Sequence, residues 1–82
     1  MADTDFEVRV IPRGGIERTL AEQPVRWTLA VPPGTTLAAV LARLGVDGGL
    51  VGVASVDGRH VRLDKALESD CEVQIFPVFG GG

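Results

Sequence analysis

The sequence predicts an α+β fold in which one helix covers one face of a mixed β-sheet. Several short segments alternate apolar and polar residues with the period of a strand, and a single segment between them has the period of a helix. The composition, 45% hydrophobic and 23% charged, is that of a globular chain. A length of 82 residues allows one small domain with a modest core.

Two strands are predicted in the first third of the chain. From residue 6 the chain alternates over five or six residues, with valines and a phenylalanine on one side and charged residues on the other, and the strand ends at Pro12. Residues 13–24 open with a glycine-rich turn and then leave open a choice between loop and irregular strand. The alternation returns over residues 25–31, where Trp27 is expected to make the largest contribution to the core.

One helix follows the second strand. Thr35 or Thr36 can cap its N-terminus, because a threonine hydroxyl accepts a hydrogen bond from an unpaired amide of the first turn. Gly45 stands where a left-handed C-terminal cap is expected. The apolar residues repeat at the spacing of one packed helical face, at Leu37, Val40, Leu41 and Leu44.

A hairpin is predicted after the helix. Residues 47–49 are expected to form a loop, and the apolar residues 50–56 a short strand that is well covered. Asp57-Gly58 favours a two-residue type I′ turn, which needs a positive φ at both positions. Val61 and Leu63 are then expected on the returning arm.

The last strand is expected over residues 72–78. It is preceded by a turn or short helical segment over residues 64–70, with Leu67 pointing inward. On the strand, inward positions alternate with outward ones, which are Val73 and Ile75 against Gln74 and Phe76. Two antiparallel strand pairs joined by a helical crossover match the β-grasp arrangement, with a mixed sheet of four to five strands.

Composition excludes several classes of function. A net charge of −3 argues against a general binder of nucleic acid or anionic membranes. The lone Cys71 excludes an intramolecular disulfide and a multi-cysteine zinc site, and the lone His60 cannot complete a histidine metal cluster. No apolar run approaches membrane-spanning length, and the acidic opening residues 1–5 are unlike a secretory signal, so a cytoplasmic location is expected.

Candidates for catalysis are weak. His60 lies beside the predicted turn with no serine or cysteine partner in view, so an exposed turn histidine is the favoured interpretation. Cys71 lies between Asp70 and Glu72, which would raise its pKa because like charges oppose the thiolate. A structural role is therefore favoured for Cys71. We expect no intrinsic catalytic residue, no metal site and no bound cofactor.

Glycine is the outlier of the composition, and three of its 11 copies are the last three residues. Average usage is about 7%, or roughly half of what this chain has. A bare glycine terminus can pass through a channel that no other residue would fit, and it presents a carboxylate suited to activation by ATP. We expect a loose lead at residues 1–5, one domain at residues 6–79 and a flexible tail at residues 80–82.

Together with the β-grasp pattern, this tail resembles the MoaD/ThiS family of ubiquitin-like sulfur carriers. The resemblance is strongest over residues 56–82, where a hairpin, a leucine-aspartate turn and a Glu-Val pair run into Ile-Phe-Pro-Val and the terminal glycines. The strand-to-helix junction at residues 31–37 is also similar. The short link after the helix resembles the thiamine-type carriers, whereas the Phe76-Pro77 ending resembles the molybdopterin type.

The resemblance implies that the protein is a carrier and not an enzyme. Gly82 would be adenylated by an activating enzyme that uses ATP and magnesium, and a persulfide sulfur donor would convert it to a thiocarboxylate. That group would deliver sulfur inside an acceptor synthase, in cofactor or metabolite biosynthesis. Gly80 and Gly81 would thread the partner's channel. The expected docking hydrophobes are Phe76, Val78 and Phe79.

Two other interpretations stay open at this point. A ubiquitin-like protein modifier would form an isopeptide bond between Gly82 and target lysines, with the same fold and the same tail. A β-grasp interaction domain would carry an inert glycine tail. Strand packing is the alternative for Phe76.

Overall fold

The computed structural model describes residues 4–14 and 26–78 of the chain. Residues that the sequence analysis left undecided, or assigned to the lead and to the tail, fall largely outside these ranges. The elements in chain order are β1 (Phe6–Pro12), β2 (Trp27–Val31), β3 (Thr35–Thr36), α1 (Leu37–Arg43), a 3-10 helix (Gly48–Leu50), β4 (Val51–Val56), β5 (Arg59–Val61), β6 (Ala66–Leu67) and β7 (Cys71–Pro77).

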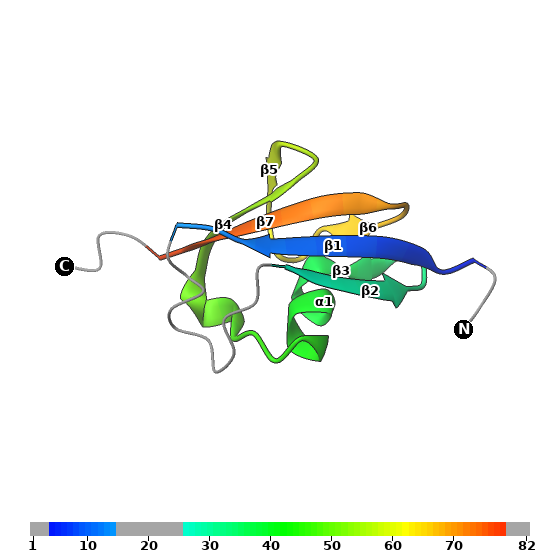
Figure 1. The fold of residues 1–82 in the computed structure, drawn as a ribbon, viewed down its shortest axis with the longest axis horizontal. Coiled ribbons are helices and arrows are strands. Elements are labelled where there is room, and N and C mark those ends of the chain that lie inside the picture. The colour runs from blue at the N-terminus through cyan, green and yellow to red at the C-terminus, as the bar shows by residue number, and fades with distance from the viewer. Residues whose placement is uncertain (1–3, 15–25, 79–82) are drawn as a thin grey trace.

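The main sheet has five strands in the order β2-β1-β7-β4-β5. β7 pairs in parallel with β1 and antiparallel with β4, while β1 with β2 and β4 with β5 form antiparallel pairs. Figure 1 shows β1 and β7 side by side along the middle of the molecule. Over the residues that the structure describes, a mixed five-stranded sheet with one α-helix confirms the predicted fold class.

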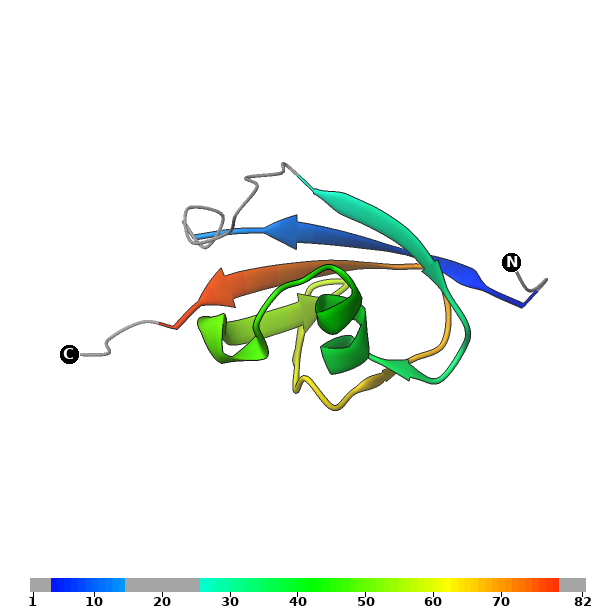
Figure 2. The same ribbon diagram turned by 90° about the horizontal axis from the view of Figure 1, so that it is seen from below.

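The core lies between the sheet and α1, which covers one face of the sheet (Figure 2). In the centre, Val10 of β1 lies opposite Val73 of β7, and Pro12 lies opposite Ile75. The side chains of Val73 and Ile75 are fully buried, as their inward positions predicted. The residues with essentially no exposed surface are Val8, Val10, Val31, Leu37, Val40, Leu41, Val73 and Ile75.

The helix begins and ends where the sequence predicts. Thr36 is the N-cap residue, and its Oγ1 accepts a hydrogen bond of 3.1 Å from the amide of Ala39. Gly45 has a φ of 77°, the left-handed conformation that ends many helices. Leu44 is the C-cap residue, so the regular helix stops one residue before the end of the apolar stripe.

The structure corrects three local predictions. Residues 66–67 form the short strand β6, which pairs with β3, so the segment 64–70 is not helical, although Leu67 does point inward. Residues 48–50 form a 3-10 turn in place of the expected loop, because the Asp47 carboxylate accepts a hydrogen bond of 2.8 Å from the amide of Gly49. Leu63 lies beyond the returning arm, since β5 ends at Val61.

The boundaries of three strands also differ from the prediction. β2 begins at Trp27, which leaves Arg26 outside the strand. β7 begins at Cys71 and ends at Pro77, which leaves Val78 outside the strand. β4 begins at Val51, because Leu50 belongs to the 3-10 turn. The ends of β7 and the start of β4 are each shifted by one residue.

Two carboxylates connect the start of β7 to neighbouring segments. Asp57 occupies the hairpin turn with a φ of 50°, next to Gly58 at 86°, which confirms the predicted turn. The Asp57 Oδ1 accepts a hydrogen bond of 2.9 Å from the amide of Glu72, and its own amide donates to the Glu72 carbonyl at 2.8 Å. The Asp70 Oδ1 accepts a hydrogen bond of 2.8 Å from the amide of Glu7. These bonds tie the hairpin and β1 to β7.

We predict that Asp57→Ala lowers the free energy of unfolding by about 1–2 kcal/mol, because it removes the acceptor for the Glu72 amide and strains a left-handed position. Asp57→Asn is the matched control, since asparagine keeps an oxygen acceptor and tolerates this conformation. Urea unfolding of the three proteins measures the difference. Equal losses in the alanine and asparagine variants would show that the hydrogen bond to Glu72 is not the cause.

Candidate functional site

The structure places two of the predicted docking residues at the end of β7, where the chain leaves the sheet. Phe76 is half-buried on the face opposite α1, and Val78 is 56% exposed just past the strand. The remaining predicted site residues, Phe79, Gly80, Gly81 and Gly82, lie outside the described residues. The site is therefore described through the segment that precedes them.

An exposed apolar cluster surrounds this end of β7. Val53 of β4 lies directly opposite Phe76 and is 38% exposed, and Leu50 is 36% exposed. Leu50 and Val78 are joined by a hydrogen bond of 3.2 Å from the Val78 amide to the Leu50 carbonyl. We call this cluster the apolar end patch; its members are Leu50, Val53, Phe76 and Val78.

Sequence reasoning missed Leu50 and Val53, because residues 50–56 read as a strand covered on both faces. The structure corrects this, since the sheet face opposite α1 carries no second layer over Val53 among the described residues. The alternation of side chains along a strand would have predicted the exposure of Val53. Once Ala54 and Val56 face the core, Val53 must face the opposite side.

The same sheet face is polar at its other end. Arg9 forms an ion pair of 3.7 Å with Glu7 on the same strand, and Glu72 lies beside Arg9 in the parallel register. The side chains of Glu7 and Arg9 are 51% and 42% exposed. A face of this kind is solvated at the charged end, and its apolar end beside Val78 is the one suited to contact with another protein.

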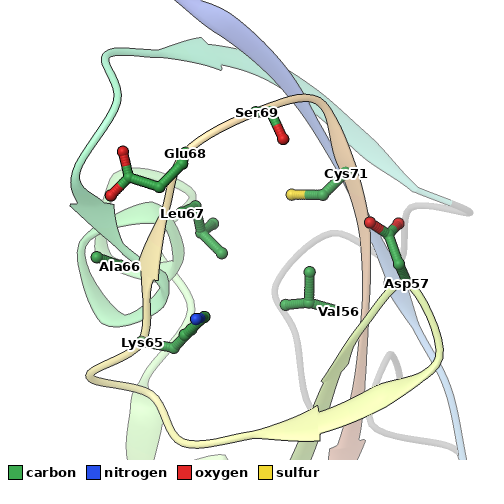
Figure 3. Close-up of a pocket in the computed structure, with 8 residues that line it drawn as sticks. All are labelled: Val56, Asp57, Lys65, Ala66, Leu67, Glu68, Ser69 and Cys71. Atoms are coloured by element: carbon green, nitrogen blue, oxygen red, sulfur yellow. The ribbon is translucent and has the colours of Figure 1, made fainter.

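A separate pocket of about 190 Å³ lies at the beginning of β7, at the opposite end from the apolar end patch. Figure 3 shows Val56, Leu67 and Cys71 directed toward one another across it. Its lining residues are Val56, Asp57, Lys65, Ala66, Leu67, Glu68, Ser69 and Cys71. Since β7 has seven residues, the strand separates this pocket from its far end by about 20 Å.

The thiol in this pocket is not activated. Cys71 is 6% exposed, and burial raises its pKa above the ordinary value of 9.0, with the nearby carboxylates of Asp57 and Asp70 adding to the effect. Arg9 opposes the shift to a smaller degree. The expected rise is present, but desolvation is its largest cause, and Asp57 takes the place of the expected Glu72. At neutral pH Cys71 is a protonated small residue of the core.

His60 offers no catalytic arrangement. It is exposed on β5 opposite Ser55, as its position beside the turn predicted. Over residues 4–14 and 26–78, no three His, Cys, Asp or Glu side chains are grouped so that they could hold a metal ion. In the same part of the chain, α1 and the 3-10 turn are too short to cross a membrane, and no membrane-spanning helix is found.

Solved structures with the same fold include three relevant proteins. SAMP1 from Haloferax volcanii is 16% identical, with a TM-score of 0.66 over 93% of this chain and 99% of its own. A putative molybdopterin converting factor, subunit 1, from Pyrococcus furiosus is 17% identical, with a TM-score of 0.63 over 88% of this chain and 97% of its own. The Caldiarchaeum subterraneum ubiquitin is 15% identical, with a TM-score of 0.60 over 95% and 99%. These likenesses show a ubiquitin-like β-grasp fold.

Sequence comparison gives the family. Among proteins with curated descriptions, none matches the sequence significantly. A model of the ThiS family matches residues 15–82, a range that includes β2 to β7, the apolar end patch and the three final glycines. This range is more than half of the 82-residue chain and agrees with the resemblance carried by residues 56–82. The chain belongs to the ThiS family of ubiquitin-like proteins.

Proposed function

We propose that this protein is a sulfur carrier whose Gly82 carboxylate is adenylated and then converted to a thiocarboxylate. The observation that carries the proposal is the ThiS family match, which runs to residue 82 and so includes Gly81 and Gly82. The exposed apolar end patch supports it, because it lies where β7 leads into these glycines. The unactivated Cys71 leaves the sulfur chemistry to a partner.

The chemistry follows from the carboxylate. An oxygen of Gly82 attacks the α-phosphorus of ATP, with magnesium held by the activating enzyme, and pyrophosphate leaves. The terminal sulfur of a persulfide donor then attacks the carbonyl carbon and displaces AMP, which forms an acyl disulfide. A second thiol of the donor then attacks the sulfur that is bound to the donor. The S–S bond of the acyl disulfide breaks, so the donor ends as a disulfide and the carrier as a thiocarboxylate.

Docking on the activating enzyme is assigned to the apolar end patch, together with Phe79. Burial of an exposed valine or phenylalanine against a partner contributes about 1.5–3 kcal/mol, which is enough to retain a small carrier during one reaction cycle. Phe76 also contacts its own sheet through Val53, so part of its surface belongs to strand packing. Val78 has no such role, because it lies beyond the strand.

Intact mass spectrometry tests the proposal. The protein is incubated with an adenylating enzyme of its organism, ATP, magnesium and a persulfide donor, and a mass increase equal to exchange of one oxygen for sulfur is expected. High-mass adducts in cell extract that disappear when Gly82 is deleted would instead indicate a protein modifier. An unchanged mass in both assays would favour the remaining interpretation, a β-grasp interaction domain with an inert tail.

We predict that Gly81→Ala lowers the rate of adenylation by at least about tenfold, because a methyl group obstructs passage through a narrow channel and misplaces the carboxylate. The midpoint of thermal unfolding should stay within about 1 °C, since the residue lies beyond the last strand. Pyrophosphate release measures the rate. Activity equal to wild type would remove Gly81 from the channel-threading role.

We predict that Val78→Asp raises KM for the activating enzyme about tenfold, which corresponds to about 1.4 kcal/mol, while kcat changes little. Thr28→Asp is the control, because it places the same charge at an exposed position of β2, away from the apolar end patch. Titration of the carrier in the adenylation assay gives both constants. An equal change of KM in the two variants would show a charge effect in place of docking.

A further inference from the structure

The β4–β7 pairing is irregular at its end, beside the point where the chain leaves the sheet. Val53 lies opposite Phe76 and Val51 lies opposite Pro77, so two steps along β4 correspond to one step along β7. Gly52 is the extra residue of this bulge. A bulge bends the strand that carries the extra residue, disrupts the ladder locally and increases its twist.

Gly52 lies in backbone contact with the departing chain. A Cβ atom built on Gly52 would stand 2.7 Å from the Pro77 carbonyl oxygen and 2.8 Å from the Val78 Cα. Both distances are below any ordinary carbon contact, and both atoms belong to backbone that cannot rotate away as a side chain can. Only glycine permits this approach.

A hydrogen bond just past the end of β7 adds to this contact. Pro77 has no amide hydrogen, so it cannot donate to β4, and the Val78 amide donates to the Leu50 carbonyl at 3.2 Å. This bond spans the bulge, because Leu50 precedes it and Gly52 forms it. The position of Val78 therefore depends on how closely Gly52 approaches Pro77.

We infer that Gly52 is a positioning residue, which fixes the place and direction in which the chain leaves the sheet at Val78. The inference rests on the proposed function for its consequence, since Gly82 follows four residues later in the sequence. A displacement at Val78 moves the start of the segment that carries the carboxylate. No side chain of the apolar end patch is removed, and Leu50, Val53 and Phe76 lie on segments before the point of departure, so most of the docking surface is kept.

The test compares Gly52→Ala with Gly48→Ala. The control makes the same substitution in the segment that precedes β4, where the new Cβ would lie 3.3 Å from the Leu63 Cδ1, the end of a flexible side chain. Nuclear magnetic resonance of the 15N-labelled full-length proteins follows the Val78 amide. Gly52→Ala is expected to shift its signal and to speed its hydrogen exchange at least about tenfold, because the bond to Leu50 is broken. Gly48→Ala is expected to leave it unchanged.

The adenylation assay gives the functional readout. Gly52→Ala is expected to lower kcat at least about tenfold while KM changes less than about threefold, since misplacement of a reacting group affects the bound complex and not its formation. Gly48→Ala should match wild type in both constants. Equal kcat in Gly52→Ala and wild type, with wild type active, would overturn the inference.

The Val78 amide measurement and the adenylation assay test the inference and the proposed function separately. Failure of wild type to be adenylated would refute the sulfur-carrier proposal, and the Val78 amide would still decide the role of Gly52 in the structure. If Gly52→Ala does not fold, the hydrogen exchange of the Val78 amide in the wild-type protein is the deciding measurement. A Val78 amide that exchanges as fast as an unprotected one would show that β4 does not hold the departing chain.

Discussion

The structure depends on the parallel pairing of β1 with β7 at the centre of the sheet. This pairing sets Val8 beside Cys71 and Val10 beside Val73, and α1 closes over them to form the one core that a chain of this length can build. Every other strand of the main sheet is added to the outside of this pair, β2 along β1 and β4 with β5 along β7. The apolar end patch exists because β7, held on both sides, leads the chain out of the sheet at a fixed place.

Local signals in the sequence were enough to predict most of this fold. Strand alternation, the Thr36 cap, the left-handed Gly45 and the Asp57-Gly58 turn each depend on residues close together in the chain, and the structure agrees with them. The short pair of β3 with β6 was not predictable in the same way, because Thr35 and Leu67 meet only after the helix has packed. The identity of the carboxylates beside Cys71 had the same limitation, since Asp57 approaches it across the β4–β7 pairing.

For the site, the sequence indicated Phe76 and Val78 but not their neighbours. Val53 joins them through strand register, and Leu50 joins them through a turn that the sequence did not reveal. The two ends of β7 have different characters as a result. One end is closed by carboxylate hydrogen bonds to Glu7 and Glu72 around a protonated thiol, and the other is apolar, exposed and joined to β4 at a glycine. The stable end anchors the strand, which leaves the other end free to meet a partner.

The central place of β7 also affects how the protein is made. β7 is synthesised after every other described strand, yet it lies between β1 and β4, so the five-stranded order cannot form before β7 has been made. A chain that ends before β7 would leave Val8 and Val10 without Cys71 and Val73, and a chain with an incomplete core is open to proteases. Formation of the complete sheet therefore requires the same strand that leads the chain to the apolar end patch.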